Sequence, residues 1–102
     1  MARLKLNPDA TFKAKVAVPV PGGTADVLCE FKYRDAKALR AYSEAHKDDA
    51  DVDAILACVV GWDLDDAFDA DSVEQLCNAY PGAAFAILSR YHRELLGIRE
   101  GN

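Results

Sequence analysis

Apolar side chains occupy every second position in two runs near the start of the chain, residues 12–18 and 25–33. A period of two residues predicts β-strands with one buried face. Residues 19–24 between the runs are rich in Pro and Gly, which predicts a turn and therefore a β-hairpin. The side chains expected to face the core are Phe12, Ala14, Val16, Val18, Val27, Cys29, Phe31 and Tyr33.

The apolar period lengthens to that of a helix after Asp35. Asp35 can cap a first helix over residues 36–47, and Asp51 can cap a second. The second apolar stripe continues to Val60, where Gly61 would end the helix. The residues on these two stripes are Leu39, Tyr42 and His46, then Val52, Ile55, Leu56, Val59 and Val60.

Two more helices are predicted after a loop over residues 62–69. Asp71 and Glu74 form a capping-box pattern for a short third helix. Pro81 suits the first turn of a fourth helix that continues to about Leu96, and Gly97 can end it. The apolar stripes are Val73, Leu76, Cys77 and Tyr80, then Ala84, Ile87, Leu88, Tyr91 and Leu95.

These elements predict an α+β fold, mostly helical, in which the N-terminal hairpin packs against about four short helices. A lone hairpin is only marginally stable, so the helices must cover it. The length of 102 residues is typical of a single domain. We expect a hairpin region over residues 1–34, a helical region over 35–98 and a short tail over 99–102.

The net charge of −5 narrows the classes of partner. Nucleic acids and anionic membrane surfaces are recognised by basic patches, so we expect neither as a partner. No stretch approaches the roughly 20 apolar residues that a membrane span needs. The basic start, Met1 to Lys5, is not followed by the apolar core of a signal peptide, which predicts a cytoplasmic protein.

The acidic residues of segment 63–74 match an EF-hand calcium loop only in part. They occupy ligand positions 1, 3, 7, 9 and 12, but Ala67 stands at position 5 and Phe68 replaces the glycine of position 6. We interpret the segment as a solvated acidic loop and expect no metal or other cofactor. The five acidic residues are Asp63, Asp65, Asp69, Asp71 and Glu74.

Asp71-Ser72-Val73 resembles the Asp-Ser-Leu signature of acyl carrier proteins, whose serine carries phosphopantetheine at the start of a helix. Carrier proteins are all-helical, however, and the glycine expected shortly before the aspartate is missing. Ser72 is equally well explained as a capping residue. A carrier protein modified on Ser72 is therefore kept only as an alternative.

No arrangement of residues predicts an enzyme. The three cysteines, Cys29, Cys58 and Cys77, form no CxxC motif and match no zinc-ligand spacing. Such cysteines are typical of small buried hydrophobic residues in a reducing compartment. His46 is expected at a helix end and His92 on an exposed helix, so neither pairs with a cysteine as a nucleophile and base would.

Aromatic residues mark the second half of the chain. Tyr80, Phe85 and Tyr91 recur at helical spacing, which predicts core positions. Trp62 and Phe68 flank the acidic loop, where they either plug the loop into the core or present a binding surface.

The order of these landmarks resembles the tail assembly chaperones of long-tailed bacteriophages. The first half agrees, with an alternating strand, a Pro/Gly turn and a second strand that ends in Phe31-Lys32-Tyr33. The more specific landmarks follow in the second half: Val59-Val60-Gly61-Trp62, Phe68, Tyr80-Pro81 and the terminal Gly101-Asn102. The resemblance covers nearly the whole chain.

The resemblance implies a non-enzymatic protein that coats the tape-measure protein, recruits tail tube subunits and is absent from the mature virion. Many such proteins also exist in a longer, frameshifted form, and this chain would be the short one. Its end carries fewer basic residues than that pattern predicts. Residues 83–88 are apolar on more than one side of a helix, which favours binding to the tape-measure protein or self-association. The candidate partner-binding residues are Trp62, Phe68, Tyr80, Phe85 and Leu88.

A second hypothesis is a generic small acidic adaptor, such as an antitoxin-like or regulatory binder. The two hypotheses predict different neighbouring genes. A tape-measure gene immediately downstream would favour the chaperone.

Overall fold

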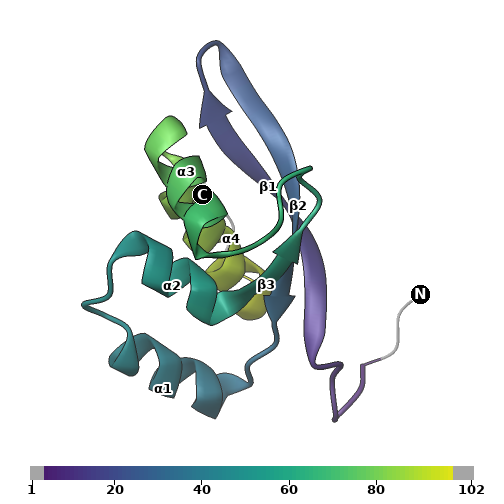
Figure 1. The fold of residues 1–102 in the computed structure, drawn as a ribbon. Helices are drawn as coiled ribbons and strands as arrows, with labels where there is room; N and C mark the ends of the chain where they lie inside the picture. Colours follow the sequence, from purple (N-terminus) through teal and green to yellow (C-terminus); the bar gives the residue numbers. More distant parts are fainter. Residues whose placement is uncertain (1–3, 98–102) are drawn as a thin grey trace.

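Two ten-residue antiparallel strands, β1 (Thr11–Val20) and β2 (Gly23–Lys32), form the hairpin in the computed structural model, which describes residues 4–97 (Figure 1). The strands are longer than predicted, because the turn consists only of Pro21 and Gly22. Gly22 has a φ of 85°, the conformation that follows proline in a type II turn. Pro19 continues the ladder because β1 is an edge strand, where a missing N–H is tolerated.

A third strand, β3 (Val59–Trp62), corrects the prediction that a helix extends to Val60 and a loop begins at Trp62. It pairs antiparallel with β2 and brings Trp62 opposite Cys29, with an irregularity at Glu30 and Phe31. Val59 is 2% exposed and Val60 is 42% exposed, an alternation typical of a strand. Gly61 is therefore a strand residue and not a helix terminator. A short run of apolar β-branched residues does not distinguish the two structures by itself.

The four helices follow the predicted order; the first begins where the sequence predicts, although it ends two residues early at Ala45, and the last ends where the sequence predicts. In α1 (Ala36–Ala45) the Asp35 carboxylate accepts a hydrogen bond from the Ala38 N–H, which confirms Asp35 as the N-cap. Gly97 ends α4 (Ala83–Leu96) in the left-handed conformation with a φ of 70°. The predicted tail at 99–102, with its terminal Gly101-Asn102, lies outside the described residues.

The caps of the two middle helices differ from the prediction. Helix α2 (Asp51–Cys58) follows Ala50, so Asp51 lies in the first turn, where its charge still favours the helix dipole. Helix α3 (Ala70–Ala79) is capped by Asp69, whose carboxylate accepts from the Ser72 N–H at 2.8 Å, and not by Asp71. Asp71 lies in the first turn of α3, where its charge favours the helix dipole.

The turn between α3 and α4 lies directly against the hairpin. Pro81 precedes α4 by two residues, so the prediction of Pro81 in its first turn was wrong; Gly82 is the N-cap. A Cβ atom on Gly82 would lie 2.9 Å from the Cγ of Pro19, which is too close for any larger residue without movement. This contact fixes the hairpin tip beside the end of α3.

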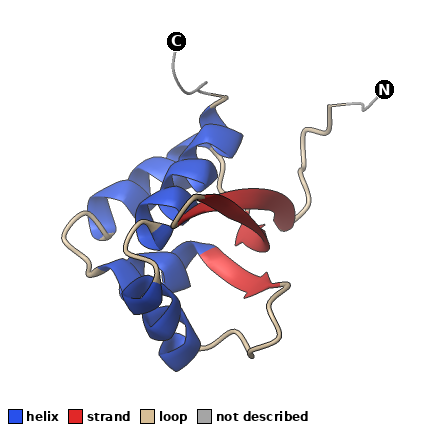
Figure 2. Ribbon diagram, turned by 90° about the horizontal axis from the view of Figure 1, so that it is seen from above, coloured by secondary structure: helices blue, strands red, loops and turns tan. Residues whose placement is uncertain are grey.

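The helices lie together on one side of the sheet, whose strand order is β1-β2-β3 (Figure 2). With 45% of the described residues in helices and 26% in strands, the fold is α+β and mostly helical, as predicted. The inward side chains of the hairpin and those of all four helices form one hydrophobic core. Its largest fully buried members are Tyr91, Phe31, Ile55 and Ile87.

Tyr91 of α4 lies at the centre of this core and connects three segments. Its ring stacks on Phe31 with a centroid distance of 5.3 Å. Its hydroxyl donates to the Lys32 carbonyl at 2.8 Å and accepts from Arg34 Nη1 at 2.9 Å. Arg34 also donates to the Ala57 carbonyl in α2 and lies 4.2 Å from the centroid of the Tyr42 ring in α1.

We expect Tyr91→Phe to lower the free energy of unfolding by about 1–3 kcal/mol, because the change leaves the Lys32 carbonyl and an Arg34 N–H without their partner. Tyr33→Phe is the matched control, since Tyr33 is 40% exposed. Urea denaturation measures both. Equal losses in the two variants would contradict the role given to the Tyr91 hydroxyl.

Candidate functional site

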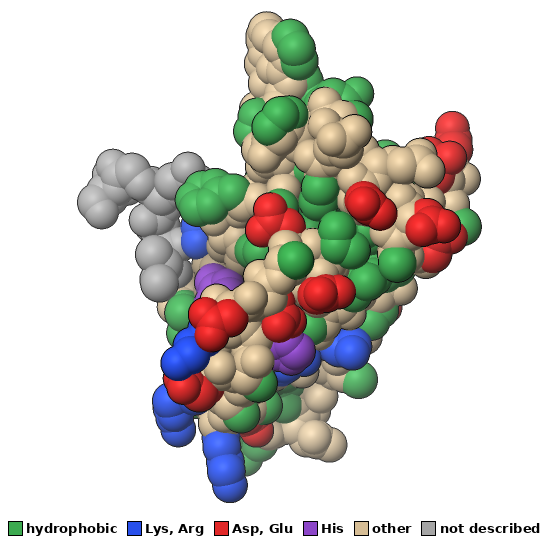
Figure 3. Space-filling model, turned by 60° about the vertical axis from the view of Figure 1, so that its left-hand side comes forward, with side chains coloured by type: hydrophobic (Ala, Val, Ile, Leu, Met, Phe, Trp, Pro, Cys, Tyr) green, Lys and Arg blue, Asp and Glu red, His purple; other side chains and the backbone are tan. Residues whose placement is uncertain are grey.

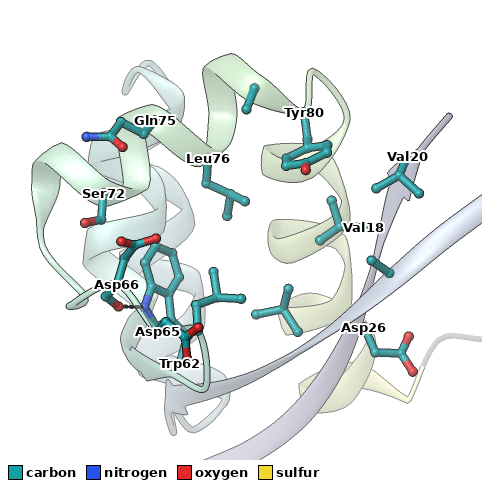
Figure 4. Close-up of a pocket in the computed structure, with 14 residues that line it drawn as sticks. Val18, Val20, Asp26, Trp62, Asp65, Asp66, Ser72, Gln75, Leu76 and Tyr80 are labelled. Carbon is teal, nitrogen blue, oxygen red and sulfur yellow. Dashed lines mark hydrogen bonds between the residues drawn. The ribbon is translucent and has the colours of Figure 1, made fainter.

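An open groove lies between the hairpin tip, the loop after β3 and helix α3, with a volume of about 440 Å³ (Figure 4). Its floor is largely apolar and its rim carries carboxylates. Among the described residues that line it there is no Lys or Arg. We call this feature the acidic-rimmed groove and define it by its apolar residues Val18, Val20, Trp62, Leu76 and Tyr80 and its rim residues Asp26, Asp65 and Asp66.

Trp62 and Phe68 hold the loop at one end of the groove. Their rings meet edge to face with a centroid distance of 5.1 Å. The Trp62 indole N–H donates to the Asp66 carbonyl at 2.8 Å, as Figure 4 shows. Both aromatic side chains are half-buried and pack against the core. Trp62 thus fastens the loop and also lines the groove, whereas Phe68 is not among the lining residues.

The core prediction for the later aromatic residues is right for Tyr91 and wrong for Tyr80 and Phe85. Tyr91 has no exposed surface, but Tyr80 is 38% exposed and Phe85 is 79% exposed. Tyr80 ends α3 and turns toward the groove, whereas Phe85 lies in the first turn of α4, outside the groove. Leu88 is half-buried against the core.

The structure therefore brings Trp62 and Tyr80 together and places Phe85 on a second surface. The groove also uses Val18 and Val20 of the hairpin tip, which sequence reasoning assigned only to the strand or the turn. The signal available for them was an uncharged apolar stretch at a turn, where polar residues are more usual.

The acidic loop serves structural roles. The Asp63 carboxylate accepts from the Leu28 N–H at 2.9 Å and so continues the contact between β2 and β3. Asp69 caps α3. Among residues 4–97, no three His, Cys, Asp or Glu residues cluster as a metal site would require.

Acidic side chains recur across this side of the molecule, with apolar side chains between them, as the space-filling view shows (Figure 3). Most of the Lys and Arg residues visible there lie at the lower end of the view, away from the hairpin tip. A partner that is both apolar and basic would match such a surface.

The cysteines are shielded from solvent. Cys29 and Cys58 are fully buried. Burial raises the pKa of the Cys29 thiol to about 12, and the nearby Asp63 and Cys58 add to the effect. Burial raises the pKa of Cys58 to about 11 and also raises that of the half-buried Cys77. A thiol with so high a pKa supplies almost no thiolate at neutral pH.

A family model described as phage tail assembly chaperone matches residues 1–102, the whole chain. The chain belongs to the phage tail assembly chaperone family. No curated protein and no solved structure gives a significant match. The family assignment agrees with the resemblance seen in the sequence and favours a chaperone over the carrier protein modified on Ser72.

Membership of the tail assembly chaperone family implies protein partners in the phage tail and is in keeping with a non-enzymatic role. None of the helices within residues 4–97 combines the length and the apolar character needed to cross a bilayer. The groove and the exposed Phe85 are therefore the candidate surfaces for partner binding.

We expect thiol reagents at pH 8 to modify Cys77 first in the folded chaperone. Cys29 and Cys58 should react only as fast as the protein unfolds, because their thiols are buried and protonated. Mass spectrometry of alkylated peptides over time measures the three rates. Labelling of Cys29 or Cys58 as fast as Cys77 would contradict the core assignment.

Proposed function

We propose that this chaperone keeps the tape-measure protein soluble and recruits tail tube subunits around it during tail assembly. The partners are inferred from the family assignment together with the surface described above. On this proposal the chaperone acts in the cytoplasm of the bacterial host and is absent from the mature virion. A tape-measure gene immediately downstream would support it over the generic adaptor.

The observation that supports a helical partner most directly is the exposure of Phe85. It is 79% exposed in a helix whose opposite side is fully buried through Ala83, Ile87 and Tyr91. Leu96, eleven residues later and therefore on nearly the same side, is 55% exposed. Leu88 flanks this side and is half-buried. We call Phe85, Leu88 and Leu96 the outer α4 surface.

A long helical protein with an apolar stripe is expected to aggregate unless another apolar surface covers that stripe. The outer α4 surface offers large apolar side chains at the spacing of a helix, which suits the packing of one helix on another. Because the net charge is −5, the resulting complex would carry acidic charge that keeps it soluble.

We expect the double change Phe85→Ser and Leu96→Ser to abolish solubilisation of the co-expressed tape-measure protein. Both side chains are exposed, so their loss should shift the free energy of unfolding by less than about 1 kcal/mol. The soluble fraction after centrifugation, compared with wild type, gives the result.

Val60→Ser is the matched control, because Val60 is also a partly exposed apolar residue but lies on β3. It should leave the tape-measure protein soluble. A tape-measure protein that remains equally soluble with the double variant, or without the chaperone, would contradict the proposal.

A further inference from the structure

The N-terminal arm, residues 4–10, carries two leucines that contact almost nothing in its own chain. Leu4 is 94% exposed and Leu6 is 99% exposed, the highest values among the large apolar residues that the structure describes. The arm forms neither helix nor strand and leaves the sheet at the end opposite the hairpin tip (Figure 1). These two uncovered leucines make the arm a candidate for contact with another molecule.

Lys5, between the two leucines, gives the arm a positive charge that the acidic-rimmed groove can match, although Asp9 makes residues 4–10 neutral as a whole. Arg3 precedes this segment in the sequence, so leucines and basic residues alternate over residues 3–6. In extended backbone such alternation places the leucines on one side and the basic residues on the other. Lys5 lies 3.4 Å from Asp9 in a largely exposed ion pair, which holds its side chain only weakly.

The groove provides the complementary features. Its apolar residues include Val20, Leu76 and Tyr80, and the carboxylates of Asp65 and Asp66 stand at its rim (Figure 4). Its volume of about 440 Å³ falls in the range of pockets that hold ligands larger than two leucine side chains.

We infer that Leu4 and Leu6 of one copy occupy the acidic-rimmed groove of a second copy. The leucines cover the apolar floor, and Lys5 lies against the carboxylates of Asp65 and Asp66. The contact depends on shape, apolar burial and charge together, and it does not rest on the identity of the phage partner.

The arm is too short to fill the far end of its own groove. Val20 lies nine residues from Thr11 along β1, a separation of roughly 30 Å at about 3.3 Å per residue. Leu6 precedes Thr11 by five residues and Leu4 by seven, so they reach at most about 18 and 25 Å from it. The end of the groove at Val20 is therefore beyond the reach of the chain's own arm, so an arm that fills the whole groove comes from another copy.

Arm and groove are different surfaces of the same chain, so the contact is heterologous. Each copy can give its arm to one neighbour and receive the arm of another, and such contacts produce open arrays unless the rotation closes a ring. The outer α4 surface takes no part in the contact.

The test is sedimentation of the full chain over a range of concentrations. Wild type should self-associate, and the double change Leu4→Ser and Leu6→Ser should lower the association constant at least about tenfold, as expected for the loss of a few buried methyl groups. The variant should keep its unfolding transition, because both leucines are exposed. Phe85→Ser, the matched control on the outer α4 surface, should leave self-association unchanged.

A charge exchange tests the pairing itself. Lys5→Glu and Asp65→Lys should each weaken self-association, and the two together should restore most of it. Trp62, the only tryptophan, lines the groove, so its fluorescence should change with protein concentration in wild type and not in the leucine variant.

Three results would overturn the inference. One is a wild-type chain that stays monomeric up to about 0.5 mM, because a dissociation constant above that concentration is too weak for a contact of this kind. Another is an oligomer that the leucine variant forms equally well. The third is a Trp62 signal that differs between the variants but does not depend on concentration, since that would place the arm in its own groove. Loss of tape-measure solubilisation in the Phe85 variant alone bears on the proposed function and not on this contact.

Discussion

The packing of Tyr91 between the sheet and the helices is the interaction on which the rest of the structure depends. Its ring covers Phe31 of the hairpin, and its hydroxyl binds both the Lys32 carbonyl and the Arg34 guanidinium. Arg34 in turn reaches the Ala57 carbonyl at the end of α2. Since three segments meet at this one side chain, the direction of α4 is fixed, and so is the side on which Phe85 is exposed.

The same arrangement produces the groove at the other end of the sheet. Helix α4 holds the preceding turn against Pro19, where Gly82 allows the close approach. Strand β3 brings Trp62 alongside β2 and so places the acidic loop opposite the hairpin tip. The packing of the core therefore determines the positions of both apolar surfaces, the acidic-rimmed groove and the outer α4 surface. Carboxylates border the groove. With two separate surfaces, one chaperone would be able to bind another copy through the groove and the tape-measure protein through the outer α4 surface at the same time.

Much of the fold could be predicted from the sequence, because the apolar period reports directly on strands and helices. Asp35 begins α1 and Gly97 ends α4, as expected. Strand β3 could not be predicted, because Val59 and Val60 also continue the stripe of α2 and only pairing with β2 decides between the two. Asp71 was predicted to cap α3 because Glu74 follows it at the spacing of a capping box, but the loop places Asp69, two residues earlier, at the cap.

The binding surfaces were harder to predict than the fold. The sequence identified Trp62, Tyr80 and Phe85 as candidates but could not separate core from surface, since aromatic residues at helical spacing suit both. The groove joins Val20, Trp62 and Tyr80, which are far apart in the chain, and so it needed the tertiary structure. The alternation of leucines and basic residues at the start of the arm can be seen in the sequence, but the groove that would bind them can be seen only in the structure.

Hydrogen–deuterium exchange of the chaperone, with and without its tape-measure protein, tests the central claim that the outer α4 surface binds the client. Peptides that cover Ala83–Leu96 should exchange more slowly when the tape-measure protein is added. Peptides from the exposed helix α1 should change little. Unchanged exchange over α4, with protection elsewhere in the chain, would contradict the account.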